Sequence, residues 1–129
     1  MTIARNLKTA ALYALILAAG LAVGLGAAKL PKLLERPYQT GDYSSHFASV
    51  ESKVVVYGTT TCPFCAKARE YLAEKKVAYS DFNVDKSEAA QQKYKTLNVK
   101  AVPAILIGDR MITGFRPDAI DDALKAITK

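Results

Sequence analysis

The sequence predicts an α/β domain with a mixed four-stranded sheet and helices on its faces, preceded by one apolar N-terminal segment. Three observations support this prediction. Residues 9–28 carry no charge. From residue 53 onward, short β-branched segments alternate with segments whose apolar residues recur at helical spacing. These segments follow the order β-α-β-α-β-β-α, in which a helix joins two parallel strands and a hairpin adds two antiparallel ones.

The uncharged segment at residues 9–28 is long enough to cross a membrane. As a helix, its 20 residues would extend about 30 Å, the thickness of a hydrocarbon core. Basic residues flank it on both sides, namely Arg5, Lys8, Lys29, Lys32 and Arg36. We therefore predict that residues 1–30 form a retained, single-pass membrane anchor. The alternative is a cleaved signal peptide, because Gly24, Gly26 and Ala28 are the small residues that a cleavage site requires.

The orientation of this segment is predicted from its place near the N-terminus. Such a segment usually enters a membrane with its N-terminus inside, so we expect the C-terminal domain on the extracytoplasmic, periplasmic side. Under the cleaved-signal alternative, the same domain is soluble in the periplasm. Residues 31–52 show no sustained periodicity and contain Pro31, Pro37 and Gly41. This composition predicts a linker between the anchor and a domain at residues 53–129.

The first half of the domain is predicted to form a strand, a helix and a strand. The segment KVVVY, which starts at Lys53, is a β-branched run typical of a buried strand. In PFCAKAREYLAEKK, Pro63 suits the first helical position, and Ala68 and Leu72 recur at helical spacing. The segment AYSDFNV alternates apolar and polar residues as a strand does.

The second half is predicted to form a helix, a hairpin and a final helix. Ser87 is placed to cap the helix SEAAQQKYKTLN, in which Tyr94 and Leu97 belong to an apolar stripe. The segments PAILI and RMIT are joined by Gly-Asp, a turn typical of hairpins. The last segment, RPDAIDDALKAIT, is amphipathic, with Ile120 and Leu124 on its inward face.

Length and charge narrow the classes of function. A chain of 129 residues, half of them hydrophobic, supports one domain of ordinary size. The net charge is +6, but the thirteen Lys or Arg residues at positions 53–129 are interspersed with nine Asp or Glu residues. No nucleic-acid-binding motif accompanies them, so nucleic-acid binding is not expected.

The only two cysteines, Cys62 and Cys65, are separated by two residues. A disulfide between them closes too small a loop to stabilise a fold. A zinc site normally takes four Cys or His ligands, and His46 is the only histidine in the chain. No metal site is therefore predicted, and the pair is better suited to reactions of its own sulfurs.

The predicted order of elements places Cys62 between the first strand and the helix that begins at Pro63. Its sulfur then faces the free N–H groups and the positive end of the helix dipole, which stabilise a thiolate. Thiols in this position reach a pKa of about 3.5–7, against about 8.5 for a free cysteine. We therefore predict that Cys62 is the nucleophile and Cys65, one turn inside the helix, is the resolving thiol. Lys67 and Arg69 are expected to face water on this amphipathic helix; the alternative is that they add positive potential beside the cysteines.

Three stretches, VVVYGTTTCPFC, AVPAILIGD and TGFRPDAI, resemble the glutaredoxin family of the thioredoxin fold. The resemblance covers about residues 53–127 and implies a thiol–disulfide oxidoreductase. It also implies that Pro103 is the family's cis-proline, beside the reactive sulfur. The backbone of Val102 would then pair with a substrate.

The chain also departs from the family members that use glutathione. Those commonly carry a lysine three residues before the nucleophile, a threonine two before the cis-proline and a Gly-Gly-x-Asp stretch near the last helix. Here these places hold Thr59, Ala101 and TGFRPD. Arg116 is a candidate for a substitute charge that binds a glutathione carboxylate. The residues that the resemblance assigns to substrate or glutathione are Thr59, Thr61, Phe64, Val102, Pro103, Gly114, Phe115 and Arg116.

The stretch TGFRPDAI is similar to that of glutaredoxin-like redoxins that serve ribonucleotide reductase and are recharged by thioredoxin reductase. Gly114 and Phe115 would then lie near Cys62, with Phe115 either contacting a partner or packing in the core. Glutathione and thioredoxin reductase are both open as electron donors. We expect a monomer with no bound cofactor beyond the redox-active pair of Cys62 and Cys65.

These features lead to one hypothesis and two alternatives. The hypothesis is a dithiol oxidoreductase that reduces or exchanges disulfides of proteins or mixed disulfides with glutathione. The first alternative is an iron–sulfur protein in which Cys62 and glutathione bridge a [2Fe–2S] cluster between two copies. The second alternative is a membrane-tethered interaction domain whose cysteine pair is incidental.

Overall fold

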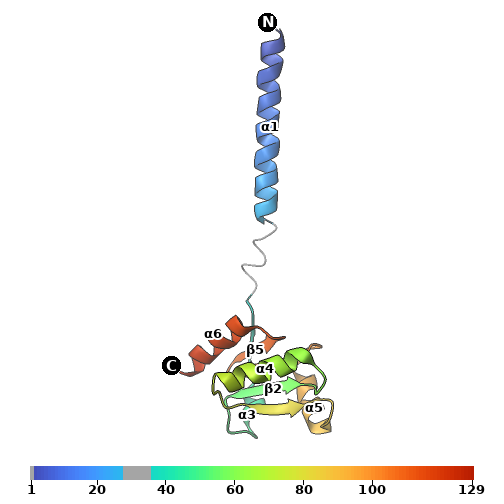
Figure 1. The fold of residues 1–129 in the computed structure, drawn as a ribbon, viewed down its shortest axis with the longest axis vertical. Coiled ribbons are helices and arrows are strands. Elements are labelled where there is room, and N and C mark those ends of the chain that lie inside the picture. Colours follow the sequence, from blue (N-terminus) through green and yellow to red (C-terminus); the bar gives the residue numbers. More distant parts are fainter. Residues whose placement is uncertain (1, 28–35) are drawn as a thin grey trace. The chain divides into compact units, whose positions relative to one another are not determined.

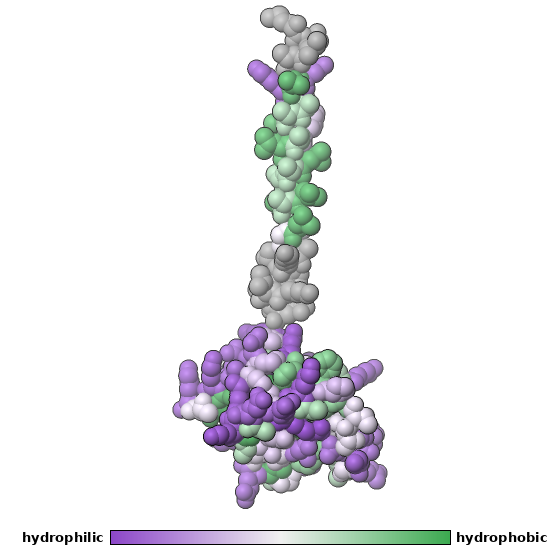
Figure 2. All heavy atoms as spheres, in the orientation of Figure 1, coloured by the Kyte–Doolittle hydropathy of each residue, from purple (hydrophilic) through white to green (hydrophobic). Residues whose placement is uncertain are grey.

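The computed structural model describes residues 2–27 and 36–129, which fall into two units (Figure 1). The first unit contains one helix, α1 (Thr2–Ala27). Within it, Asn6–Gly26 is long and apolar enough to cross a membrane, with a mean hydropathy of 2.0, and Figure 2 shows its apolar side chains. A signal sequence near an N-terminus has the same features. The predicted apolar helix is confirmed, whereas its retention and orientation stay predictions.

The second unit, Pro37–Lys129, is built around a five-stranded sheet. Its elements in chain order are β1 (Gln39–Thr40), α3 (Ser44–Phe47), β2 (Val54–Gly58), α4 (Pro63–Glu74), β3 (Ser80–Asn83), α5 (Glu88–Thr96), β4 (Ala104–Ile107), β5 (Arg110–Thr113) and α6 (Pro117–Ile127). The strands lie in the order β1-β5-β4-β2-β3, in which β2 and β3 are parallel and all other neighbours are antiparallel. The mixed sheet and the predicted order of elements are confirmed from β2 to α6.

The prediction of four strands is wrong, because β1 forms a fifth strand at the edge of the sheet. Gln39 lies opposite Met111 on β5, and the following residue pairs with Arg110. The guanidinium of Arg110 also lies 4.4 Å from the ring centroid of Tyr38, a cation–π contact that adds to this pairing. A strand of two residues has no alternation of its own, so only its pairing with β5 defines it.

Residues 37–52, which the sequence assigns to a linker, are part of this folded unit. They contain β1 and the single-turn helix α3, in which His46 is only 6% exposed. Three further side chains of this stretch pack against one face of the sheet, namely Tyr43, Phe47 and Val50. Of the other predicted linker residues, Arg36 belongs to the first unit and residues 31–35 lie outside the described residues.

The sheet is packed on both faces. Successive residues of β2 and β4 point to opposite faces, and both strands are buried along their whole length. On one face, α4 and α6 cover Val54, Val56, Ile105, Ile107 and Ile112. On the other face, α3 and the end of α5 cover Val55, Tyr57, Ala104, Leu106 and Met111. The C-terminal end of β2 is therefore well packed and fixes the position of the residues that follow it.

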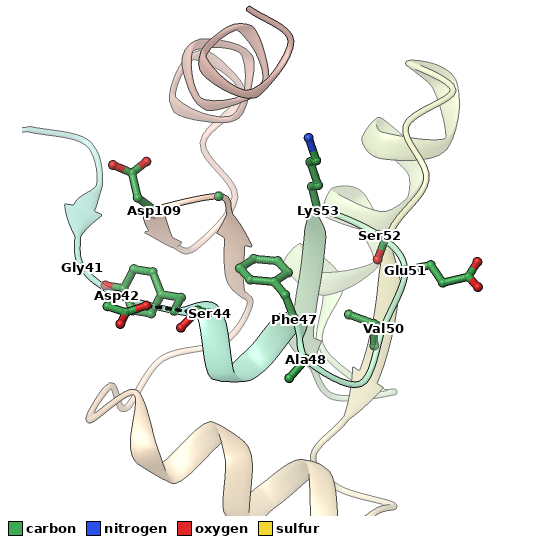
Figure 3. Close-up of a pocket in the computed structure, with 12 residues that line it drawn as sticks. Gly41, Asp42, Ser44, Phe47, Ala48, Val50, Glu51, Ser52, Lys53 and Asp109 are labelled. Carbon is green, nitrogen blue, oxygen red and sulfur yellow. Dashed lines mark hydrogen bonds between the residues drawn. The ribbon is translucent and has the colours of Figure 1, made fainter.

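A cavity of about 560 Å³ lies near the N-terminal end of β2 (Figure 3). It opens between residues 41–53 and the turn that joins β4 to β5, and Phe47 and Val50 contribute apolar walls. The backbone N–H of Gly41 donates to the carbonyl of Asp109 at 2.9 Å and ties the two segments together. Neither cysteine lines this cavity, because both follow the opposite end of β2.

Candidate functional site

Cys62 stands between the end of β2 and the first turn of α4. It is the N-cap residue of α4, with extended backbone angles (φ −82°, ψ 117°), and Pro63 follows in the first turn. Its Sγ accepts the backbone N–H of Cys65 at 3.2 Å. The sulfur thus occupies the place of a capping oxygen, at one of the N–H groups that a helix start leaves free. Negative charge on this sulfur is stabilised by the helix dipole.

The two sulfurs differ in exposure. Both cysteines are free thiols, but Cys62 is half-buried whereas Cys65 is fully buried, with 0% of its surface exposed. A disulfide of a partner can therefore approach Cys62 and cannot approach Cys65 from outside. Cys65 can react only with a sulfur that is already at the position of Cys62.

The surroundings also separate the pKa values of the two thiols. Partial burial raises the pKa of Cys62, but hydrogen bonds from the Cys65 thiol and from the N–H groups of Cys65 and Phe64 outweigh this effect. With the added charge of Arg69, the pKa of Cys62 lies below its ordinary value. Burial, followed by the hydrogen bond to Cys62, raises the pKa of Cys65 to about 11. Cys62 is thus the thiol that ionises first.

A cis peptide bond lies beside Cys62. The bond between Val102 and Pro103 is cis, and the carbonyl oxygen of Val102 is 4.0 Å from the sulfur of Cys62. The carbonyl of the buried Pro103 accepts the N–H of Gly114 at 2.8 Å. This bond brings the loop after β5 next to the segment before β4. The resemblance assigns Val102, Pro103 and Gly114 to substrate binding. All three therefore lie at the end of the sheet where Cys62 is located.

Thr61 and Phe64 flank Cys62 in the sequence and are both exposed. Phe64 is 57% exposed, which is unusual for a large apolar side chain in the folded unit. The amine of Lys67 lies 5.7 Å from the centroid of this ring. An aromatic ring next to the reactive sulfur, with a cation beside it, is available for contact with a partner.

Phe115 and Arg116 lie in the loop that leads into α6. The ring of Phe115 is half-buried and packs edge-on against Tyr71 of α4, with 5.7 Å between the ring centroids. Phe115 therefore has a packing role. Arg116 is exposed, and its Nη1 donates to the carbonyl of Pro37 at 3.5 Å, where the chain approaches β1.

The turn that carries Cys62 is held by contacts that the sequence does not predict. Thr60 donates its backbone N–H at 3.1 Å and its hydroxyl at 2.5 Å to the same oxygen of Asp85. These bonds lower the pKa of Asp85, so this carboxylate stays ionised near neutral pH. The neighbouring Thr59 accepts a hydrogen bond from Arg69 at its carbonyl oxygen, at 3.3 Å. Because Asp85 lies 25 positions from its partner, no local pattern predicts the contact.

Arg69 does not face water, so the expectation for this residue is wrong. Its side chain is 20% exposed and forms an ion pair with Asp81 on β3 at 3.0 Å. Its Nη2 donates to the side-chain oxygen of Asn83 at 2.9 Å. Arg69 stands four residues after Cys65, so both lie on the same inward face of α4. That spacing is the signal in the sequence by which the residue could have been found.

Gly58, the last residue of β2, leaves room for the dithiol. A Cβ atom at this position would lie 3.0 Å from the sulfur of Cys65 and 3.0 Å from Nη2 of Arg69. These separations are tighter than most contacts of a real Cβ atom, so a larger residue would require the sulfur or the guanidinium to shift by a few tenths of an ångström. The sequence shows only a glycine at the end of a strand and does not indicate this role.

No metal site accompanies these cysteines in the described part of the chain. Among residues 2–27 and 36–129, no three or more His, Cys, Asp or Glu side chains are grouped so that they could hold a metal ion. The single histidine, His46, is hydrogen-bonded to Tyr57 and Thr96.

Comparisons with known proteins agree with this geometry. The family model described as Glutaredoxin matches residues 54–112. The chain is 33% identical over 73 residues to an uncharacterized glutaredoxin-like 8.6 kDa protein in the rubredoxin operon of Clostridium pasteurianum, covering 56% of this chain and 97% of that protein. It is 28% identical over 67 residues to the glutaredoxin-like protein NrdH of Lactococcus lactis, covering 52% of this chain and 93% of that protein.

A solved structure shows the same fold. The glutaredoxin of Archaeoglobus fulgidus is similar to this chain with a TM-score of 0.55 and 22% sequence identity, over 66% of this chain and 98% of that one. The family match begins at residue 54, so residues 37–53, with β1 and α3, precede it.

Proposed function

The chain belongs to the glutaredoxin family of thiol–disulfide oxidoreductases, and we propose that it works through a dithiol mechanism in which Cys62 attacks and Cys65 resolves. One observation carries this proposal. The half-exposed sulfur of Cys62 caps a helix and has a lowered pKa, whereas the sulfur of Cys65 is buried beside it with a raised pKa. This asymmetry gives the two thiols different tasks.

The reaction begins when the thiolate of Cys62 attacks one sulfur of a substrate disulfide. A bond forms between Cys62 and that sulfur, the substrate disulfide breaks, and the other substrate sulfur leaves as a thiolate that takes a proton. Cys65 then attacks the mixed disulfide at Cys62. The second substrate thiol is released, the Cys62–Cys65 disulfide remains, and two electrons have passed to the substrate.

The substrate is proposed to lie against the groups at the end of the sheet where Cys62 is located. The backbone of Val102, which precedes the cis bond to Pro103 and has its carbonyl 4.0 Å from the sulfur of Cys62, would pair with an extended substrate backbone, as the family resemblance implies. Phe64 offers an exposed apolar surface beside the sulfur. Thr59, Thr61, Gly114, Phe115 and Arg116 belong to the same proposal through the resemblance.

The electron donor is proposed to be glutathione or thioredoxin reductase. Thr59 stands where glutathione-using relatives commonly carry lysine, and the nearest partner of Arg116 is the carbonyl of Pro37. These features weaken the case for glutathione, while the resemblance of the stretch TGFRPDAI favours a reductase. Rates of reduction of the purified oxidised protein by each donor distinguish the two.

The protein is proposed to act as a membrane-anchored monomer with its redox domain outside the cytoplasm. The support is the segment Asn6–Gly26, which is long and apolar enough to cross a membrane. Labelling of Cys62 in whole cells by a membrane-impermeant thiol reagent tests the orientation. Labelling that occurs only after lysis would place the domain in the cytoplasm.

The mechanism is tested by replacing each cysteine in turn. Cys65→Ser should accumulate a mixed disulfide with a model disulfide substrate, because the first step proceeds and the second cannot. Cys62→Ser should form none and should be inactive. If both variants reduce the substrate at the rate of the parent, the dithiol assignment is wrong.

A further inference from the structure

The side chain of Arg69 approaches the dithiol from inside the domain. We propose that Arg69 is a positioning residue for the second half of the reaction: it holds the turn that carries Cys62 and stabilises the negative charge that Cys65 must acquire. This inference rests on the dithiol mechanism proposed above, in which Cys65 resolves the mixed disulfide. It requires no contact between Arg69 and the substrate.

Contacts on three sides fix the guanidinium of Arg69. Its Nε pairs with the carboxylate of Asp81 at 3.0 Å, and its Nη2 donates to Asn83 at 2.9 Å, so both hold it to β3. Its Nη1 donates to the carbonyl of Thr59 at 3.3 Å, three residues before Cys62. A planar group with partners on three sides keeps one orientation. Its positive charge therefore has a defined place between β3 and the active-site turn.

That place is close to the sulfur of Cys65. The point where Gly58 would carry a Cβ atom lies 3.0 Å from the Cys65 sulfur and 3.0 Å from Nη2 of Arg69. The two atoms are therefore separated by no more than about 6 Å, the sum of these two distances. Because Gly58 has no side chain, it does not separate the sulfur from the guanidinium. At this separation inside a protein, a positive charge has a strong effect on a thiolate.

Cys65 has particular need of such a charge. Its thiol is fully buried, and in the reduced protein burial, followed by the hydrogen bond to Cys62, raises its pKa to about 11. The burial persists when Cys62 is in the mixed disulfide, so it still opposes formation of the attacking thiolate. The free N–H groups at the start of α4 stabilise a thiolate at Cys62, and the N–H of Cys65 is already bound to the sulfur of Cys62, so it does not stabilise a thiolate at Cys65. The charge of Arg69 acts in the opposite direction to burial and lowers the pKa of Cys65. Lys67, a nearby cation on α4, is exposed and lies beside the ring of Phe64.

The step that Arg69 assists is balanced in atoms and electrons. The thiol of Cys65 gives its proton to solvent, and its sulfur attacks the sulfur of Cys62 in the mixed disulfide. The Cys62–Cys65 bond forms and the bond from Cys62 to the substrate breaks. The substrate sulfur leaves with the electron pair and takes up a proton, so no further reductant is needed.

The first experiment measures the pKa of Cys65 directly. In the full chain carrying Cys62→Ser, the NMR chemical shift of the ¹³C-labelled Cβ of Cys65, which reports ionisation without access of a reagent to the buried sulfur, is followed against pH with Arg69 present or with Arg69→Gln. We expect the substitution to raise the pKa of Cys65 by about one unit, because Asp81 already offsets part of the charge. Arg69→Lys, which keeps the charge, should restore most of this shift. An unchanged pKa in Arg69→Gln overturns the proposal.

Two matched variants separate the charge of Arg69 from its structural contacts. Asp81→Asn breaks the same ion pair but leaves the positive charge, so the pKa of Cys65 should fall or stay constant. Lys67→Gln removes an exposed cation from the same helix and should leave this pKa unchanged. Thermal unfolding of each variant establishes that it is folded. If Arg69→Gln and Asp81→Asn raise the pKa of Cys65 equally, Arg69 acts through structure alone and the proposal fails.

Single-turnover kinetics test the assignment to the second step. The thiolate of Cys65 would be about tenfold scarcer in Arg69→Gln but also more nucleophilic, so release of the second substrate thiol should slow about threefold. Formation of the mixed disulfide, measured in Cys65→Ser, should slow less. Equal slowing of both steps contradicts the assignment. If Cys65→Ser forms no mixed disulfide at all, the dithiol function fails, whereas the NMR titration of Cys65 needs no substrate and still tests Arg69.

Discussion

The imidazole of His46 shares a hydrogen bond of 2.9 Å with the phenol oxygen of Tyr57 on β2. The other ring nitrogen lies 3.4 Å from the hydroxyl of Thr96 at the end of α5. His46 itself belongs to α3, which precedes the region matched by the glutaredoxin family. One buried side chain therefore joins the N-terminal extension, residues 37–53, to two elements of the redox domain.

Removal of this extension should destabilise the redox domain. A chain that begins at Pro37 keeps the extension and should fold, whereas one that begins at Val54 uncovers the sheet face under Tyr43, Phe47 and Val50. We expect the shorter chain to lose about 3 kcal/mol or more, because each of these side chains contributes roughly 1–2 kcal/mol on burial. Urea unfolding of both chains measures the difference. Equal stabilities would mean that the extension is dispensable for folding.

Substitution of His46 should reduce stability by breaking the link to Tyr57. In His46→Ala, the phenol oxygen of the fully buried Tyr57 loses its partner, at a cost of about 1–3 kcal/mol. Tyr57→Phe should cost about as much, because it leaves a nitrogen of His46 unpaired. A double-mutant cycle by urea unfolding measures the coupling. Additive losses would show that the bond contributes nothing of its own.

The same histidine should make the stability depend on pH. Burial, followed by the charge of Lys93, lowers the pKa of His46 in the folded state. As the pH falls, the unfolded chain therefore binds the proton first, at its ordinary pKa of about 6.5. The contribution of His46 to stability should be complete above pH 6.5 or so and decline as the pH falls below this value. Urea unfolding at pH 5 and pH 8 measures the slope, which should be shallower in His46→Gln.

The sequence predicts the parts of the fold whose signals are local. The β-branched run of β2, the proline at the start of α4 and Ser87, whose hydroxyl accepts the N–H of Ala90 at 3.3 Å, each act within one element. The place of Cys62 at a helix start follows from the same local pattern. These elements are long enough to show their own periodicity, so no tertiary contact is needed to recognise them.

The features that the sequence does not predict depend on contacts between distant residues. Thr40 is in a strand only because it pairs with Arg110, and α3 is a single turn held by the bond between His46 and Tyr57. Arg69 is turned inward by carboxylate and amide groups on β3. In each case a partner many positions away decides the structure. Periodicity within one element carries no information about that partner.

Replacement of Gly58 should displace the buried sulfur of Cys65 or the guanidinium beside it. In Gly58→Ala, the new Cβ would lie 3.0 Å from the sulfur of Cys65, so that sulfur or the guanidinium of Arg69 must move. Overpacking of this kind typically costs about 1–3 kcal/mol. We expect a lower melting temperature and slower resolution of the mixed disulfide. Thr61→Ala, in the exposed part of the same turn, is the matched control and should leave the melting temperature within one or two degrees.

The two cysteines should be alkylated in different ranges of pH. The pKa of Cys62 is lowered by hydrogen bonds from Cys65 and Phe64 that outweigh its partial burial, whereas burial raises the pKa of Cys65 to about 11. A lower pKa means more thiolate at a given pH, and the thiolate is the reactive form. With iodoacetamide at neutral pH, mass spectrometry of the reduced protein should therefore find the label on Cys62 first.

The pH profile of this reaction gives the quantitative test. The rate at Cys62 should reach half its maximum below the pKa of an ordinary cysteine, about 8.5, while Cys65 stays almost unlabelled until the solution is strongly alkaline. Cys62→Ser should abolish labelling at neutral pH, because the remaining sulfur is both protonated and 0% exposed. Labelling of Cys65 at the same rate as Cys62 would contradict the buried, protonated state of the resolving thiol. The order of the two chemical steps would then have no basis in this site, because the order rests on the difference between the two sulfurs.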